Sequence, residues 1–256
     1  MSLEKETKLK LLYQLLPEGV VVPSSWLISN GYSSQLIYKY VQNGWLEKIS
    51  RGVYVRPASI ITWQGIAIGI QSLCEIPFYI GGITALNIQG YAHYLPIGEE
   101  KYITMHGKDK TPSWIKQINN YSFIVHKKPF FGELGLKKYQ SSIRDLELTI
   151  SSPERAILEL LYLISDKGVS FQFAAEIFEG MSTLSPRLLN ELLQNCDSMK
   201  VKKIFLFFAH YYNFAWFKYI NKNITLGSGK LQVVKDGVYN KEYRLTIPKE
   251  FDVQSD

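Results

Sequence analysis

Residues 31–57, GYSSQLIYKYVQNGWLEKISRGVYVRP, carry the pattern that most restricts the fold of this chain. Ser33 is a residue type that caps helix N-termini, and Gly44 is one that ends helices. The expected elements are a helix from 33 to about 43, a strand at 45–49, a turn at 50–52 and a strand at 53–56. A short helix followed at once by a β-hairpin is compatible with few small folds.

Two more helices are predicted before this unit. Apolar residues recur at helical spacing in residues 4–16, and Pro23 and Ser24 open a second helix that ends near Gly31. Helix, helix, tight turn, helix and hairpin is the order of a winged helix-turn-helix, which lays one helix in the DNA major groove with a hairpin beside it. We therefore predict a DNA-binding domain at residues 1–57. Winged helices also dock proteins, and the sequence leaves that alternative open.

Residues 58–256 are predicted to form a larger, mixed α/β C-terminal domain, with a division into two subdomains near residue 150 left open. Strands are expected at 101–106, 122–126, 136–139 and 146–150, and helices at 60–74, 82–91, 112–118, 153–164, 171–179, 186–195 and 198–212. A final hairpin is expected to turn at Asp236 and Gly237, because Asp-Gly between strand-like segments favours a two-residue turn. The predicted fold class of the whole chain is α+β.

Charge favours an anionic partner for the N-terminal unit. The formal net charge is +6, and residues 1–57 hold seven basic and four acidic side chains. In the third helix the apolar side chains form a stripe that must face the other helices, and the opposite face has no acid to repel phosphate. The residues predicted to contact DNA are Ser34, Gln35, Tyr38, Lys39 and Gln42 from the helix, and Lys48, Ser50 and Arg51 from the hairpin.

The sequence offers little for catalysis. LGSGKL at 226–231 lacks the first glycine and the Ser or Thr of a phosphate-binding loop, and no histidine has a close partner at metal-ligand spacing. A metal nuclease is the enzymatic alternative, because Asp145 and Glu147 lie in a strand-like segment. Thr149 stands where such sites use a lysine to stabilise the transition state. We predict no catalytic residue, no metal and no cofactor.

Two further expectations concern packing and location. The aromatic block at 211–219 is expected to be core, with a partner-binding surface as the alternative. Two cysteines, a charged N-terminus without an apolar core and the lack of a long apolar stretch predict a cytoplasmic protein that makes no membrane contact.

Four segments in order carry a resemblance to a known family. They are WLISNGYSSQLIYKYVQNGWLEKISRGVYV (26–55), YIGGITALNIQGYAHYL (79–95), SSPERAILELL (151–161) and LGSGKLQVVKDGVYNKEYRLTIP (226–248). Together they resemble the AbiEi family, the antitoxins and transcriptional regulators of bacterial abortive-infection systems of type IV. One departure is Leu231, where a basic residue is expected after Gly-Ser-Gly-Lys.

The resemblance implies two functions. An N-terminal winged helix would bind double-stranded DNA at inverted repeats in its own promoter, and this mapping adds Ser33 to the DNA-contacting residues. The C-terminal part would counteract a cognate nucleotidyltransferase-like toxin, functionally and through direct contact as one route. The segments that the resemblance assigns to that antitoxic function are 81–94, 152–161 and 227–230.

Overall fold

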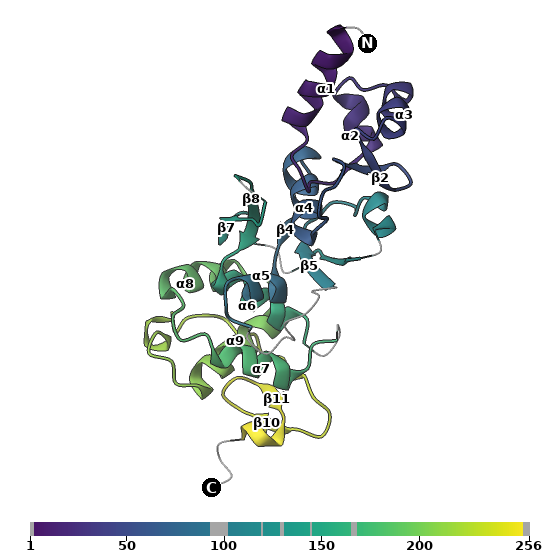
Figure 1. Ribbon diagram of the computed structural model, residues 1–256. Coiled ribbons are helices and arrows are strands. Elements are labelled where there is room, and N and C mark those ends of the chain that lie inside the picture. The colour runs from purple at the N-terminus through teal and green to yellow at the C-terminus, as the bar shows by residue number, and fades with distance from the viewer. Residues whose placement is uncertain are drawn as a thin grey trace. The chain divides into compact units, whose positions relative to one another are not determined.

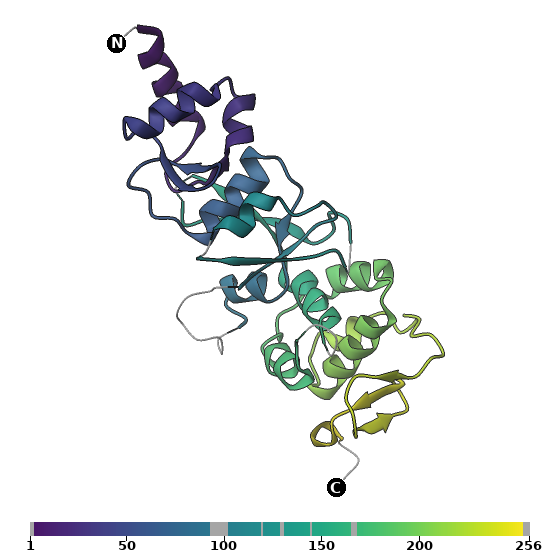
Figure 2. The same ribbon diagram turned by 90° about the vertical axis from the view of Figure 1, so that its right-hand side faces the viewer.

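The computed structural model describes residues 3–92, 102–118, 120–128, 131–143, 145–164 and 168–252, with the backbone alone at 3–6. Its described residues form two compact units (Figures 1 and 2). The first comprises Met1–Tyr79, Gly98–His126 and Lys138–Thr149. The second comprises Ile80–Ile97, Lys127–Lys137 and Ile150–Asp256.

The first unit begins with the predicted winged helix-turn-helix. Its elements are α1 (Leu3–Leu15), β1 (Val22–Pro23), α2 (Ser24–Ser29), α3 (Ser34–Gln42), β2 (Glu47–Ser50) and β3 (Val53–Val55). The strands form an antiparallel sheet in the order β1-β3-β2. The three helices and the hairpin confirm the prediction, whereas β1 was not predicted, because two residues give no strand periodicity.

Apolar side chains and two phenols hold the three helices together. Leu12, Leu27 and Ile37 are buried, one from each helix. The Tyr32 hydroxyl donates to the Lys8 carbonyl at 3.1 Å, and the Tyr13 hydroxyl donates to the Trp45 carbonyl at 3.0 Å. These long-range bonds fix α1 against the segments that flank α3.

The helix that follows the winged helix packs on it through two glycines. The predicted helix at 60–74 begins later, as α4 (Trp63–Ile68), and continues in a π-helical turn, η1 (Gly69–Leu73). A Cβ atom added to Gly65 would lie 2.0 Å from the Gly19 carbonyl oxygen, and one added to Gly69 would lie 2.0 Å from that of Val21. Only glycine permits this backbone contact.

Five further strands form a sheet in the order β6-β5-β4-β8-β7. They are β4 (Tyr79–Ile80), β5 (Tyr102–His106), β6 (Ser122–His126), β7 (Leu136–Gln140) and β8 (Glu147–Ser151). Strand pairs β5–β6 and β4–β8 are parallel. The four longer strands were predicted within about one residue, although Lys101 lies outside the described residues. Strand β4 was missed because it is too short to show a period.

The helices of the second unit agree closely with the sequence. They are α5 (Gly82–Ile88), α6 (Pro153–Tyr162), α7 (Phe171–Glu179), α8 (Pro186–Asn195) and α9 (Met199–Tyr211). Each of the last four begins after a serine whose hydroxyl accepts from a backbone N–H of the first turn, at Ser152, Ser170, Ser185 and Ser198. These caps explain why the helix starts could be predicted.

The aromatic block after α9 is core only in part. Trp216 is 5% exposed and its indole N–H donates to the Met181 carbonyl at 2.8 Å, whereas Tyr219 is 62% exposed. The buried aromatic cluster lies earlier in the chain, around Phe178, Phe205 and Phe208 on α7 and α9.

The prediction that the C-terminal hairpin turns at Asp236 and Gly237 is wrong. Strand β10 (Val238–Asn240) pairs with β11 (Leu245–Ile247), and β9 (Leu231–Gln232) pairs in parallel with β11, in the order β10-β11-β9. The chain turns after Asn240, whose side-chain oxygen accepts from Tyr243 N–H at 3.0 Å. This local bond directs the turn, so Asp236 and Gly237 connect two strands that do not pair.

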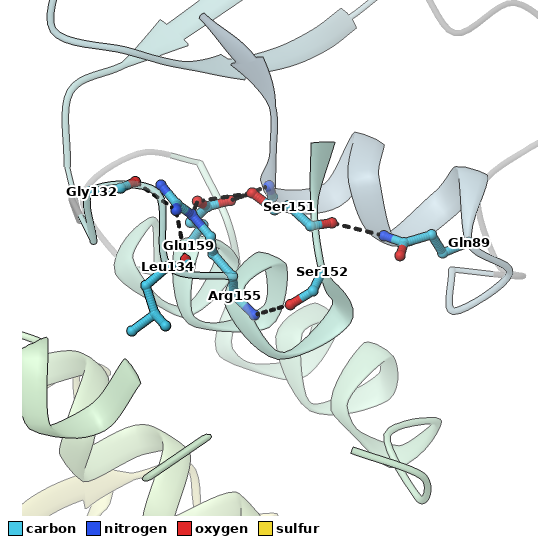
Figure 3. Close-up of polar contacts among 8 residues, drawn as sticks. Gln89, Gly132, Leu134, Ser151, Ser152, Arg155 and Glu159 are labelled. Atoms are coloured by element: carbon cyan, nitrogen blue, oxygen red, sulfur yellow. Dashed lines mark hydrogen bonds and ion pairs between the residues drawn. The ribbon is translucent and has the colours of Figure 1, made fainter. Parts of the chain in front are cut away.

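A buried ion pair organises the second unit (Figure 3). Arg155 Nε donates to Glu159 Oε1 at 2.9 Å, and both side chains are 0% exposed. The same guanidinium donates to the carbonyls of Gly132 and Leu134 at 2.9 and 2.7 Å. Because a buried charge is stable only when paired and hydrogen bonded, this pair draws separate chain segments together.

The carboxylate of the pair extends the network to α5 and β8. Glu159 Oε2 accepts from the Gly82 N–H and from the Ser151 hydroxyl, both at 2.9 Å. Gln89 Nε2 donates to the Ser151 carbonyl at 3.0 Å (Figure 3). Helices α5 and α6 therefore meet around a fully buried carboxylate.

The close contact at Gly65 predicts a stability effect. A Gly65→Ala substitution should lower the free energy of unfolding by about 2 kcal/mol, because overpacking outweighs the higher helix propensity of alanine. Urea denaturation measures it. Gly229→Ala is the matched control, because its methyl group would meet no described atom within 4 Å. Equal stability of the two variants would contradict the contact.

The buried pair predicts a second, larger effect. Arg155→Ala should cost about 3–5 kcal/mol of unfolding free energy, because it leaves the Glu159 carboxylate buried without its cation. Arg187→Ala is the control, since Arg187 and Glu191 have the same spacing and a 3.4 Å contact, but their side chains are 92% and 46% exposed. That variant should lose at most about 0.5 kcal/mol. Similar losses would refute the argument.

Candidate nucleic-acid interface

Capping residues at both ends define α3. The Ser33 hydroxyl accepts from Leu36 N–H at 3.3 Å, as the sequence predicts for an N-cap. Beyond the C-cap Asn43, Gly44 adopts a φ of 70°, a left-handed conformation that glycine takes without strain. The helix is therefore limited to nine residues between two local signals.

The inner face of α3 is fixed by aromatic packing. Tyr40 is 1% exposed, and its ring lies 6.2 Å from that of Tyr32 and 5.4 Å from that of Trp45. Burial raises the pKa of the Tyr40 phenol, so this side chain stays neutral at physiological pH. Ile37 is 3% exposed beside it. This packing prevents α3 from rotating on its support.

The outer face of α3 is open to solvent. All six residues predicted to contact DNA from this segment are exposed: Ser33, Ser34, Gln35, Tyr38, Lys39 and Gln42. Tyr38 has 65% of its surface exposed. The sequence of α3 contains no acid, so this face presents one ammonium with amide and hydroxyl groups. Such groups can bind phosphates and base edges.

The hairpin beside α3 holds the other predicted residues. Lys48 and Arg51 are exposed. Gly52 has a φ of 72° at the turn, and its carbonyl accepts from Ser24 N–H at 2.8 Å, which ties the turn to α2. The pairing of β2 with β3 shifts register between Lys48 and Ser50. The hairpin therefore presents two cations at a fixed place in the same fold.

Ser50 makes a contact that the sequence does not predict. It is half-buried, and its hydroxyl donates to Gln117 Oε1 at 3.3 Å. Gln117 lies 67 positions later in the chain, in the short 3-10 helix η2 (Ser113–Gln117). No local pattern could indicate such a contact.

The alternative chemical sites do not assemble in the described part of the chain. There, no group of three or more His, Cys, Asp or Glu side chains could hold a metal ion. Glu147 is exposed, and Asp145 lies in the turn before it with a φ of 59°. His106 and His126 have ring centroids 5.4 Å apart, a pair that their spacing of 20 residues did not suggest, and His93 lies outside the described residues.

In the loop at 227–230, backbone carbonyls accept hydrogen bonds from cationic side chains. The Lys203 ammonium donates to the Gly229 carbonyl, and Arg244 Nη1 donates to the Gly227 carbonyl at 2.9 Å. A phosphate loop needs the opposite polarity, with backbone N–H groups directed at the ligand. The geometry agrees with the failed sequence match.

Two of the three segments assigned to the antitoxic function lie together. The segment 81–94, of which the structure describes residues 81–92, contains α5, and the segment 152–161 lies in α6 and its N-cap. Helix α5 packs against α6. The Gly82 N–H to Glu159 bond joins them. Their most polar members, Arg155 and Glu159, are buried, so they support the fold and are not accessible to a partner.

Comparisons with known proteins agree with the geometry. A family model described as "Transcriptional regulator, AbiEi antitoxin N-terminal domain" matches residues 5–97, and one described as "Transcriptional regulator, AbiEi antitoxin, Type IV TA system" matches residues 99–248. The chain belongs to the AbiEi family. AbiEi proteins are transcriptional regulators and antitoxins of type IV toxin–antitoxin systems, as the sequence resemblance implied.

A solved structure shares the fold of this AbiEi chain. The crystal structure of RV2827C protein from Mycobacterium tuberculosis has a TM-score of 0.59 and 14% sequence identity, over 96% of this chain and 91% of that chain. No curated protein matches the sequence. Across the residues that the structure describes, no helix is both long and apolar enough to span a membrane.

Proposed function

We propose that this AbiEi chain binds operator DNA through α3 and the β2–β3 hairpin and represses its own operon. The observation that carries the proposal is the exposed, acid-free face of α3 beside the exposed cations Lys48 and Arg51. Inverted repeats in the promoter, as the family resemblance implies, would supply the operator. The proposed division of labour gives residues 1–57 the DNA contacts.

The proposed binding combines electrostatic contacts to phosphates with hydrogen bonds to base edges. Lys48 and Arg51 neutralise phosphates beside the groove and release counterions, which supplies affinity without sequence preference. Gln35 and Gln42 lie two turns apart on the exposed face of α3, where their amides can pair with adenine edges, and Lys39 can donate to guanine. Ser33 and Ser34, at the N-terminus of α3, are placed to donate to a phosphate.

We further propose that residues 58–256 counteract a nucleotidyltransferase-like toxin, without a catalytic step by the antitoxin. Family membership supports this part of the proposal. The antitoxin function then depends on a surface other than α3. Substitutions on α3 and the hairpin should therefore separate the two activities.

The DNA-binding proposal predicts a loss of affinity in the variant Lys39→Ala/Arg51→Ala. Gel shifts on the duplex upstream of the gene should show binding weaker by about tenfold or more, with the salt dependence reduced by about one phosphate contact, that of Arg51. Lys235→Ala/Lys241→Ala removes the same charge from exposed positions of the second unit and serves as the control. Equal affinity of the two double variants would refute this docking.

The antitoxin proposal predicts that the same Lys39→Ala/Arg51→Ala variant still protects cells. Growth of cells that co-express the toxin is the measurement. Arg155→Ala should protect less well, because a loss of about 3–5 kcal/mol is a large share of the stability of a typical domain and raises the unfolded fraction of the second unit. Loss of protection by both variants would show that the activities are not separable.

A further inference from the structure

The helical turn η2 lies directly beside the hairpin. The bond from the Ser50 hydroxyl to Gln117 Oε1 joins the last residue of β2 to the last residue of η2. Figure 1 shows this turn as a teal helical segment next to β2. Any duplex that contacts the hairpin at Lys48 and Arg51 therefore passes close to η2.

Apolar anchors hold η2 in place. Ile115 is 2% exposed and Ile118 is 7% exposed, so both are buried in the first unit. The Ile115 N–H donates to the Pro112 carbonyl and the Ile118 N–H donates to the Ile115 carbonyl, each at 3.2 Å. Between these anchors, Lys116 and Gln117 are exposed. The turn thus presents its polar side chains from a rigid base.

The exposed side chains of η2 and of the residues before it carry the positive charge that binding to DNA phosphates requires. Lys116 and Lys110 are both exposed, with Asp109 as the acid of the segment 107–118. A hollow of about 310 Å³ lies next to Lys116, lined by the hydroxyl-bearing Thr111, Tyr121 and Ser122 and by the apolar Ile115, Ile118 and Phe123. None of the residues described as lining this hollow is acidic. Hydroxyl and ammonium groups can both bind phosphate oxygens.

We infer that η2 and the residues before it form a second DNA-contacting surface, which binds phosphates of the duplex that flanks the operator half-site. The inference rests on the proposed DNA binding and extends it beyond residue 57. Lys116 and Lys110 neutralise flanking phosphates, while the Ser50–Gln117 bond keeps this surface in register with the hairpin. Its contribution is independent of base sequence, because it reaches only the sugar-phosphate backbone.

The test compares exposed double variants of the full chain on one probe, the duplex upstream of its own gene with its flanking sequence. Lys110→Ala/Lys116→Ala should weaken binding about tenfold and lower the salt slope by about two, near 0.9 for each lost phosphate contact. The hydroxyl-radical footprint should shorten at its flank while the central protection stays. Lys235→Ala/Lys241→Ala, with the same loss of charge, should change neither quantity.

The outcomes separate this inference from the function it extends. If the wild-type chain does not retain the duplex, the proposed function fails and the inference fails with it. If the wild type binds and Lys110→Ala/Lys116→Ala keeps its affinity, salt slope and footprint, only the inference is overturned. Matching circular dichroism melting curves for all variants exclude unfolding as the cause of a loss.

Discussion

The contact of two glycines with a neighbouring backbone is the constraint on which the first unit depends. Gly65 and Gly69 lie one helical turn apart and admit the carbonyls of Gly19 and Val21 where any side chain would collide. Backbone packed so closely cannot slide, because each contact is set by atoms without rotational freedom. The winged helix is therefore packed on α4 through the segment before β1, and α3 is held within it against α2.

In the second unit, a buried ion pair has the corresponding role. The pair of Arg155 and Glu159 would be costly to bury alone, so the fold must provide carbonyls, a hydroxyl and a backbone N–H around it. These partners come from α5, from β8 and from the segment that precedes β7 (Figure 3). The polar residues of the SSPER segment thus have a structural role, and a toxin would have to recognise other side chains.

The surface proposed to contact DNA extends beyond the N-terminal winged helix. Ser50 is joined to Gln117, so the hairpin and a turn from much later in the chain share one surface. The Lys110 and Lys116 side chains would then add to the electrostatic part of the proposed affinity for DNA.

Local signals in the sequence determined where most elements begin and end. Ser33, Ser152 and Ser185 cap helices through bonds to residues three positions away, and such bonds need no tertiary partner. The exposed face of α3 was predictable for the same reason, because its apolar stripe fixes which side is buried. Only the tertiary structure decided the pairing of β9 with β11, the burial of Arg155 and the contact of Ser50 with Gln117. Strands β9 and β11 are separated by β10, Arg155 bonds to carbonyls 21 and 23 positions earlier, and Ser50 bonds 67 positions ahead. At such separations packing energy, and not local backbone preference, selects the partner.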